Sequence, residues 1–332
     1  MDRNTLIMDL KIRNKTAAGF TLIELLVVIG IIALLLSIAM PALSKAKEMG
    51  RSVVCKAHLR GIGGGLMNYT TMYDGWLAGP NTSGIKLNTY QQTEFNQNTI
   101  PVQNVDWVSP TVGDDLGLNN DRYKRMTDIF NTELRCPSNR VNYSFIYDQP
   151  SDWPADLVAE NMNYTSYSAV LGFQLTSWRG LSNYADYITD KTDYGIENIV
   201  QMPSGYRPKI EKVGTPSLKI YVVEGARYMN SPEEVSFNAF DRQIVGGNFM
   251  THGPSVVMAG DPYSGLLQMG ELADSLQDFN KQYAWRHDGK FNVVFFDGHC
   301  ETMKWQDSLK TSYYFPQGYK VLNSYATQDP YD

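Results

Sequence analysis

The sequence predicts an α+β protein, in which one long N-terminal helix, first transmembrane and then amphipathic, is followed by a head with an antiparallel β-sheet. An apolar run from Phe20 to Met40 continues into a polar segment with helical periodicity. The composition changes near Trp76, after which Asn, Tyr, Gly, Asp and Ser are frequent and helical patterns are rare. The clearest strand patterns come late in the chain and flank an Asp-Gly pair, which is typical of a β-hairpin.

Length and net charge limit the possible number of domains and the classes of partner. A chain of 332 residues has room for two average domains, or for one domain with a long appendage. The formal net charge is -6 and no basic stripe is present, so we expect no nucleic-acid partner.

Residues 1–19 are predicted to be a cytoplasmic leader, because Lys11, Arg13 and Lys15 precede the apolar run and basic residues favour the inner side of a membrane. Residues 20–40 would form a helix about 31 Å long, which is enough to span a bilayer. An ordinary secretory signal is the alternative. Its apolar part would be shorter and would end in an Ala-x-Ala-like site, which does not follow cleanly here.

Glu24 is the one carboxylate inside this apolar run. A charge at the centre of a bilayer costs about 2.5–3.5 kcal/mol, and such a residue is a functional candidate. Glu24 lies one helical turn after Phe20. If the chain were cut between Gly19 and Phe20, the new ammonium would have an acid partner within reach. The pattern therefore predicts a segment that is inserted, cut and packed against copies of itself, whereas a plain membrane anchor has no use for Glu24.

Residues 41–75 are predicted to continue the helix. Pro41 removes a backbone donor, so we expect a kink there. One apolar stripe is predicted on the amphipathic part, formed by Leu43, Ala46, Gly50, Val53 and Ala57. The run Gly61–Gly65 should weaken the helix. A second helical piece, Leu66–Tyr73, is predicted before Asp74-Gly75 turns the chain.

The head is predicted to cover residues 76–332. Its first part, 76–135, looks loop-rich, with a short helix at Arg122–Phe130. One strand is predicted at Leu218–Val223. A hairpin is predicted from Asn292–Phe296, a two-residue Asp297-Gly298 turn and His299–Met303.

The head also contains groups that could bind metal. Glu224, His287, Asp297 and His299, with Asp288, are hard or borderline ligands. We favour structural roles for them, because Asp before Gly is ordinary turn chemistry. An oxygen-rich loop is a second candidate, for calcium, and contains Asp114, Asp115, Asn119, Asn120 and Asp121. Its spacing is not that of an EF-hand, so a solvated loop is favoured and no cofactor is predicted.

No enzyme is predicted. The chain has four histidines, no Gly-x-Ser-x-Gly and no phosphate-binding loop. Neither Thr251-His252-Gly253 nor Trp285-Arg286-His287 forms a recognisable triad. The abundant aromatic residues suit sugar recognition, but they equally suit the core of a loop-rich domain.

The stretch Gly19-Phe20-Thr21-Leu22-Ile23-Glu24, with the apolar residues after it and Pro41, resembles the class III signal of type IV pilins and type II secretion pseudopilins. The resemblance implies that a prepilin peptidase cuts after Gly19 and methylates the Phe20 amine. It implies that Glu24 guides docking by pairing with a neighbour's N-terminal amine, and that Pro41 marks the usual kink.

The same resemblance implies a function and a set of partners. The chain would join other pilin or pseudopilin subunits, on an inner-membrane assembly platform, in a type II secretion pseudopilus or a type IV pilus-like filament. It would be a single-pass membrane protein before assembly, with its head in the periplasm or extracellular space, and part of a filament afterwards. The alternative is a surface-displayed adhesin, or a glycan- or ligand-binding head, anchored by a pilin helix.

The head more loosely resembles long prepilin-like proteins with a late His-x9-Asp-Gly signature, matched here by His287 and Asp297-Gly298. Further matches are Cys55, Cys136-Pro137-Ser138, and Glu224 after Pro216-Ser217. Three cysteines allow at most one bridge, and the residues alone leave its pairing open. The resemblance favours a Cys55–Cys136 disulfide that ties the helix to the head. Cys300, in the predicted hairpin strand, is expected to be a buried thiol. The triple glycine at 63–65 departs from this group.

Overall fold

The computed structural model describes residues 20–78, 97–100, 106–129, 131, 134–140, 145–147, 166–170, 173–174, 200–201, 203–225, 234–236, 285–304, 307 and 310–321. The predicted leader, the Gly19 side of the cleavage site and the stretch Thr251-His252-Gly253 lie outside these residues. The chain forms two compact units, Met1–Lys47 and Glu48–Asp332.

One helix, α1, extends from Leu22 to Met72 and contributes residues to both units. Its N-terminal part is apolar and exposed, and among the described helices it has the length and composition needed to cross a membrane. The helix continues through Pro41 without interruption. The kink expected there stays a prediction.

The start of α1 is fixed by a capping box. The backbone N–H and the hydroxyl of Thr21 both donate to Oε2 of Glu24, at 2.9 and 2.8 Å. In return, the backbone N–H of Glu24 donates to the Thr21 hydroxyl oxygen at 3.2 Å. Reciprocal bonds of this kind satisfy backbone donors that a helix N-terminus leaves open. Glu24 therefore has a structural role within its own chain.

The glycine run does not divide the helix, so the separate second piece predicted at Leu66–Tyr73 is wrong. Close packing explains the difference. A Cβ on Gly65 would lie 2.3 Å from Cγ1 of Val112, and a Cβ on Gly63 would lie 3.1 Å from Cγ2 of Val294. The two buried glycines thus let the helix backbone approach its neighbours, and this packing outweighs their low helix propensity.

The predicted apolar stripe is also not the face that packs in the head. Leu43 and Val53 are 69% and 66% exposed. The buried positions of α1 follow another face, with Cys55, Leu59, Ile62, Leu66 and Tyr69 at helical spacing. Full burial of a Leu or Ile side chain contributes about 1.5–3 kcal/mol, so this face fixes the helix in the head.

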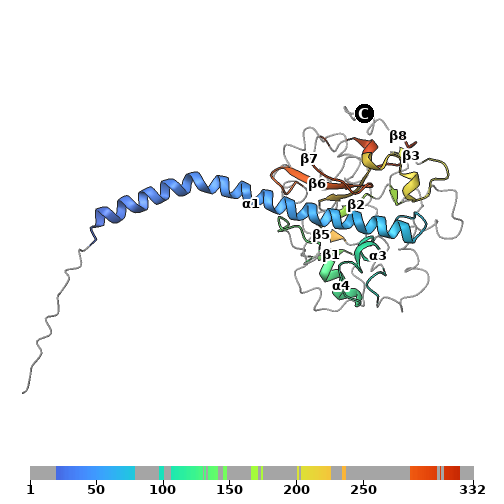
Figure 1. Ribbon diagram of the computed structural model, residues 1–332, viewed down its shortest axis with the longest axis horizontal. Coiled ribbons are helices and arrows are strands. Elements are labelled where there is room, and N and C mark those ends of the chain that lie inside the picture. The colour runs from blue at the N-terminus through green and yellow to red at the C-terminus, as the bar shows by residue number, and fades with distance from the viewer. Residues whose placement is uncertain are drawn as a thin grey trace, which may run out of the picture. The chain divides into compact units, whose positions relative to one another are not determined.

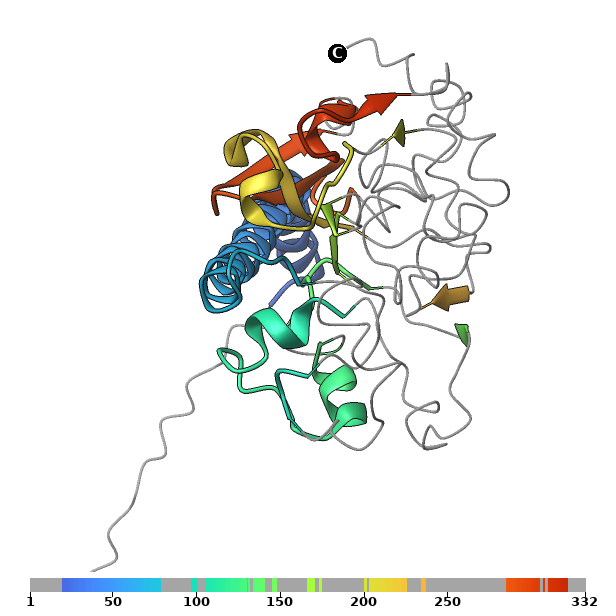
Figure 2. The ribbon, with the colours of Figure 1, turned by 90° about the vertical axis from the view of Figure 1, so that its right-hand side faces the viewer.

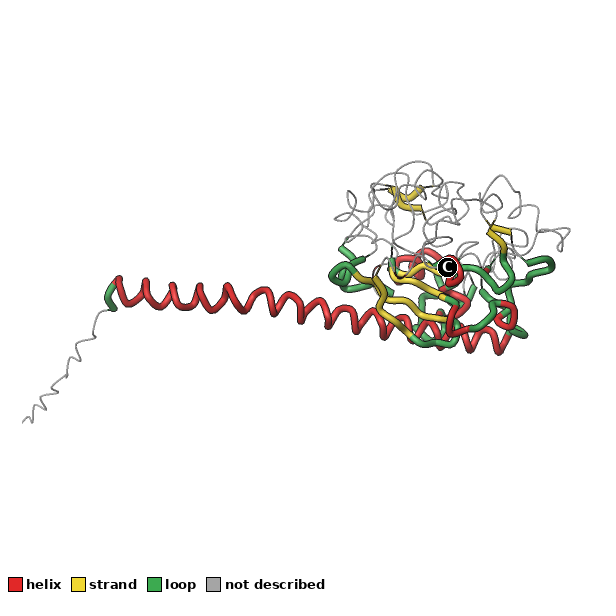
Figure 3. The backbone as a smooth tube through the Cα atoms, turned by 90° about the horizontal axis from the view of Figure 1, so that it is seen from above, coloured by secondary structure: helices red, strands yellow, loops and turns green. Residues whose placement is uncertain are grey.

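A four-stranded antiparallel sheet packs beside this part of the helix (Figure 1), and its strand order is β2-β4-β6-β7. The strands are β2 (Tyr167–Ala169), β4 (Ile220–Glu224), β6 (Lys290–Phe295) and β7 (Cys300–Lys304). In a second view the sheet strands lie over the helix (Figure 3). The sheet confirms the predicted α+β architecture and places the strand predicted at Leu218–Val223 in β4, although Leu218 itself belongs to a short 3-10 helix.

The predicted hairpin is present, but its loop is one residue longer than expected. Val294 pairs with Cys300, and the N–H of Phe295 donates to the carbonyl of His299 at 3.0 Å. Three residues, Phe296, Asp297 and Gly298, therefore connect the strands. Gly298 has a φ of 85°, as a three-residue loop with a left-handed third position requires.

Two short helices lie on the other side of α1 from the sheet (Figure 2), α3 (Val108–Val112) and α4 (Arg122–Asp128). The start of α4 agrees with the predicted helix at Arg122. The remaining described elements are β1 (Phe145–Tyr147), β3 (Val200–Gln201), β5 (Glu234–Ser236), β8 (Lys320–Val321), and 3-10 helices η6 (Ile210–Lys212), η7 (Pro216–Leu218) and η10 (Thr311–Tyr313). Strands β1 and β5 pair in parallel, and β3 and β8 pair antiparallel.

Candidate functional site

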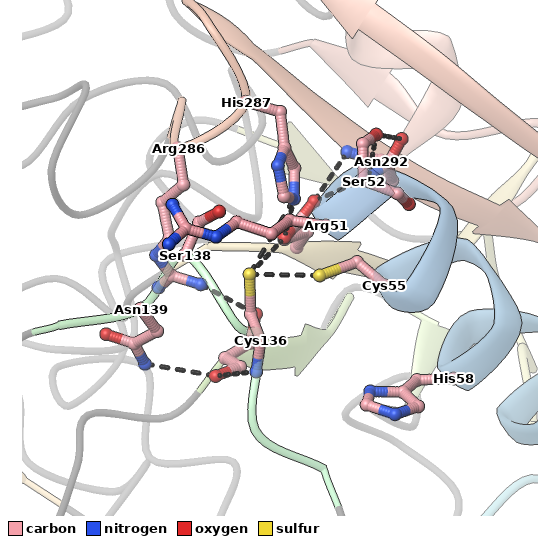
Figure 4. Close-up of polar contacts among 12 residues, drawn as sticks. Arg51, Ser52, Cys55, His58, Cys136, Ser138, Asn139, Arg286, His287 and Asn292 are labelled. Carbon is pink, nitrogen blue, oxygen red and sulfur yellow. Dashed lines mark hydrogen bonds and ion pairs between the residues drawn. The ribbon is translucent and has the colours of Figure 1, made fainter. Parts of the chain in front are cut away.

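Four residues that are far apart in the sequence meet inside the head, and three of them, Cys55, Cys136 and His287, are labelled in Figure 4. Cys55 lies on α1, Cys136 on a loop, Glu224 at the end of β4, and His287 in the turn before β6. One sulfur, oxygen or nitrogen atom from each lies within 4.8 Å of the others. All four residues are buried, and we call them the buried cluster.

The imidazole of His287 lies between two carboxylates. Its Nε2 atom is 2.6 Å from Oε1 of Glu224, and its Nδ1 atom is 2.6 Å from Oε1 of Glu48 on α1. Glu224 is completely buried, and such a carboxylate is tolerated in a protein core only with partners of this kind. The contacts therefore bind the helix and the sheet through one ring.

The two cysteines lie side by side. Their sulfur atoms are 2.9 Å apart, and the Cys136 sulfur is also 2.9 Å from Oε1 of Glu224 and 3.6 Å from Nε2 of His287. They are two free thiols here, whereas a bridged pair has its sulfurs about 2.05 Å apart. The disulfide suggested by the resemblance stays a prediction, although the two residues it names are neighbours. Cys300 is half-buried rather than buried as predicted, because it lies on the edge strand β7, and its sulfur is 3.9 Å from the carbonyl of Lys56.

A second layer of polar groups holds the buried cluster. The backbone N–H and the side-chain amide of Asn292 both donate to Oε2 of Glu224, at 3.0 and 2.9 Å. The same amide donates to the Ser52 hydroxyl on α1 at 3.1 Å. Glu48 accepts bonds from Ser138, at 2.5 Å, and from Arg51, at 3.1 Å. Each carboxylate is thus oriented by groups outside the buried cluster.

These contacts shift the acidities of the cluster. Burial alone would lower the pKa of His287, but its contacts with Cys136 and Glu224 raise it to about 10. Burial alone would raise the pKa of Glu224, but the His287 hydrogen bond and charge keep it below the ordinary value. Burial also opposes ionisation of Cys136, yet bonds from Cys55 and His287 and the charge of Arg286 lower its pKa to about 7. The hydrogen bond with Cys136 and burial raise the pKa of Cys55.

This arrangement constrains the chemistry. The Cys136 sulfur, His287 and Glu48 have the donor types of a nucleophile, base and orienting acid, but Cys136 and Cys55 have no exposed surface. A substrate has no access to the sulfur in this arrangement. The cluster is suited to joining chain segments, either through a bridge or through an ion.

The other predicted ligands lie elsewhere. Asp297 and His299 contact each other at the hairpin loop, where Oδ1 of Asp297 accepts from Nδ1 and from the backbone N–H of His299, at 2.5 and 3.1 Å. The His299 ring stacks on Phe295, with centroids 4.1 Å apart. Of the four residues considered as one ligand set, Glu224 and His287 therefore lie together in the buried cluster, whereas Asp297 and His299 lie at the hairpin loop. The contacts of Asp297 are those of the turn role expected for it.

The acidic loop at 114–121 is organised by a buried cation from the chain itself. One nitrogen of the Arg125 guanidinium donates to the backbone carbonyls of Asn119 and Asn120 at 2.7 and 2.8 Å. The carboxylate of Asp121 caps α4 by accepting from the backbone N–H of Lys124. Arg125 therefore holds the backbone of this loop in place, and whether its side-chain oxygens bind calcium stays a prediction.

The structure adds functional candidates that sequence reasoning did not single out. Glu48 and Asn292 hold His287 and Glu224 of the buried cluster from outside, and Thr21 caps α1 with Glu24. Two signals were available. Glu48, Ser52 and Cys55 are spaced by four and three residues, which places them on one helix face. The sequence Thr21-Leu22-Ile23-Glu24 has the Thr-x-x-Glu spacing of a capping box.

Residues 14–40 match the protein-family model described as the prokaryotic N-terminal methylation motif. The match includes Phe20 and Glu24 and supports a type IV pilin-like protein that is processed by a prepilin peptidase. The motif is that of structural subunits rather than enzymes. It is compatible with single-pass membrane anchoring through the apolar part of α1. No curated protein and no solved structure matches the sequence.

Proposed function

We propose that the chain is the precursor of a pilin-like subunit, which a prepilin peptidase cuts between Gly19 and Phe20 and methylates on the new Phe20 amine. The observation that carries this proposal is the methylation-motif match at residues 14–40, which coincides with an exposed apolar helix. The mature chain begins one residue before the Thr21–Glu24 capping box. Cleavage therefore releases an amine one residue before the Thr21 N–H that donates to Glu24.

Glu24 guides assembly in this proposal. In hydrocarbon, an unpaired carboxylate is costly, so docking favours the register in which a neighbour's N-terminal amine pairs with it. Both hydrogen bonds from Thr21 use Oε2 of Glu24. The capping box holds the carboxylate at the helix start, and its negative charge remains to attract a cation.

The assembled product is a pseudopilus of a type II secretion-like machine or a type IV pilus-like filament, built on an inner-membrane platform. The size of the head favours a minor or tip position, since side-by-side packing of helices limits lateral room. The buried cluster supports a structural subunit, because it joins the helix to the sheet by ion pairs and offers no exposed reactive group.

Cell fractionation with mass spectrometry tests the proposal. The methylated Phe20 peptide is expected in processed chain, and a Gly19→Leu variant should keep its leader because the bulky side chain blocks the peptidase. Normal shortening of that variant would contradict the assigned site. An abundance of the processed chain in sheared surface material favours a pilus or a displayed adhesin. Its confinement to membranes favours the secretion pseudopilus.

A further inference from the structure

We propose that Cys55, Cys136, Glu224 and His287 form a closed structural site for one zinc ion, which fastens α1 to the head sheet. The four donor atoms come from four separate stretches of chain and lie within 4.8 Å of one another. The site is independent of the pilin role, because it depends on the internal geometry of the unit Glu48–Asp332.

The donor set is the first argument. Two sulfurs, one imidazole nitrogen and one carboxylate oxygen are the ligands that zinc takes in tetrahedral sites, with bonds of about 2.3 Å to sulfur and about 2.0–2.1 Å to nitrogen. Thiolates select against calcium and magnesium, which prefer oxygen. All four residues are buried, so the protein supplies the whole coordination shell, as in structural rather than catalytic zinc sites.

The outer contacts are the second argument. Nδ1 of His287 faces Glu48 at 2.6 Å, which leaves Nε2 toward the sulfurs. Oε2 of Glu224 is held by Asn292, which leaves Oε1 toward the Cys136 sulfur. A carboxylate behind a ligating histidine, and a hydrogen-bonded ligating carboxylate, are the usual second layer of a zinc site. His287 and Glu224 are therefore held from behind, with Nε2 and Oε1 on the side of the Cys136 sulfur, although these two atoms now contact each other at 2.6 Å.

The charges also balance. Binding would displace a proton from each thiol and the proton on Nε2 of His287, and these protons would pass to solvent. Two thiolates and the Glu224 carboxylate would then face the doubly charged ion and leave one negative charge. The Arg286 guanidinium acts electrostatically on both Cys136 and Glu224 and offsets that charge.

A disulfide is the competing chemistry for the same sulfurs. It would use Cys55 and Cys136 alone and would leave His287 and Glu224 facing a neutral bridge. Zinc uses all four groups, but it requires the sulfurs to separate from 2.9 Å to about 3.8 Å, the span set by two tetrahedral bonds of about 2.3 Å. It also requires Nε2 of His287 and Oε1 of Glu224 to separate from 2.6 Å to about 3.3 Å, the span set by two tetrahedral bonds of about 2.0–2.1 Å. Four donors converge here, and three of them are held by contacts that are already present: His287 by Glu48, Glu224 by Asn292, and Cys136 by Glu224. This convergence favours the ion.

The test uses the full chain in detergent. It is purified without added reductant for metal analysis and for mass mapping of its cysteines. A second sample is reduced, stripped with chelator and titrated with zinc chloride or cobalt chloride. We expect one zinc per chain, a higher Tm with zinc, and the thiolate charge-transfer and intense tetrahedral bands of bound Co²⁺.

The variants locate the ion. A Cys55→Ser, Cys136→Ser double variant should lose the cobalt spectrum, whereas Cys300→Ser, which changes the thiol outside the cluster, should keep it. Glu48→Gln should weaken zinc binding by about 10–100-fold, because it removes the charge behind His287. The absence of stoichiometric metal together with a Cys55–Cys136 bridge would overturn the proposal. So would an unchanged cobalt spectrum in the double variant. The wild-type spectrum decides the matter even if the variants fold poorly.

Discussion

Glu48 and His287 are 239 positions apart in the chain, yet Oε1 of the glutamate lies 2.6 Å from Nδ1 of the imidazole. Glu48 lies on α1, and His287 lies in the turn that leads into β6. Because the other ring nitrogen contacts Glu224 at the end of β4, the ring is held to the sheet. A shift of α1 along the sheet would therefore break the contact between Glu48 and His287. The pair therefore fixes the register between the helix and the head.

Replacement of Glu48 by Gln should lower the free energy of unfolding of the head by about 1–3 kcal/mol, since the buried imidazole loses a charged acceptor. Urea unfolding followed by tryptophan fluorescence, in chelator and detergent, measures the change. Glu211→Gln is the matched control, because Glu211 is exposed in η6 and should shift stability by less than about 0.5 kcal/mol. Equal effects of the two substitutions would show that Glu48 does not fasten the helix.

Two neighbouring glycines of α1 should respond in opposite directions to the same added methyl group. Gly65→Ala places a Cβ 2.3 Å from Val112 and 2.7 Å from the carbonyl of Thr111, so it should cost about 1–3 kcal/mol. Gly64→Ala meets no atom within 4 Å and should stabilise the helix by up to about 1 kcal/mol. Melting temperatures of the two variants report the signs, and destabilisation by both would refute the packing role of Gly65.

Asp297 should make the hairpin sensitive to acid. Burial alone would raise its pKa, but hydrogen bonds from His299 hold the pKa below the ordinary value of 3.8. A lowered carboxyl pKa contributes stability above the ordinary value, and this is lost as the pH falls through the folded-state value. The contribution should be below about 1 kcal/mol, because the pair is partly exposed.

Asp297→Asn should therefore flatten the dependence of head stability on pH below about 4, relative to the wild type. Unfolding curves from neutral pH down to about pH 2.5 measure this dependence. Asp115→Asn removes a charge from an exposed loop away from the hairpin and serves as the control. An unchanged acid profile for Asp297→Asn would contradict the assigned pairing with His299.

Substitutions at Glu24 separate its role in capping α1 from its proposed role in docking. Glu24→Gln keeps an oxygen that can accept from Thr21 but removes the charge, whereas Glu24→Val removes both. Cleavage after Gly19 should continue in each variant, and incorporation into filaments should fall in both. The measurement is the ratio of assembled to membrane-bound processed chain. Normal assembly of Glu24→Gln would show that the charge does not guide docking.

The sequence was sufficient for the parts of the fold that rest on local patterns. The apolar run from Phe20, the strand ending at Glu224 and the hairpin around Gly298 are each visible within a short stretch of residues. The hairpin loop was predicted one residue too short, because the pairing of Phe295 with His299 depends on strand register and an Asp-Gly pair suits both loop lengths.

Other features depend on long-range packing and could not be predicted. The helix continues through Gly63 and Gly65 because β6 and α3 lie against them, and no local propensity carries that information. The helix face that packs in the head was not predicted, for a similar reason. Leu43 and Val53 are the apolar residues, but the head binds the face with Glu48 and Cys55, where ion pairs replace part of the apolar contact.

The residues of the buried cluster were predicted as candidates, but their meeting at one place was not. Cys55, Cys136, Glu224 and His287 were each singled out for separate reasons, as a disulfide pair and as metal candidates. Only the sheet topology brings the end of β4 and the turn before β6 to the same side of α1. Glu48 was absent from the predicted set, because a glutamate on a polar helix face is usually solvated.

The most direct test of the pilin assignment is the mass of the N-terminal peptide of the chain isolated from membranes. We expect a peptide that begins at Phe20 and carries one methyl group on its amine, with Glu24 intact. A chain that still begins with its leader, or that is cut after the apolar run near Met40, would contradict the account. The first result would mean that processing does not occur, and the second would mean that the segment is an ordinary secretory signal.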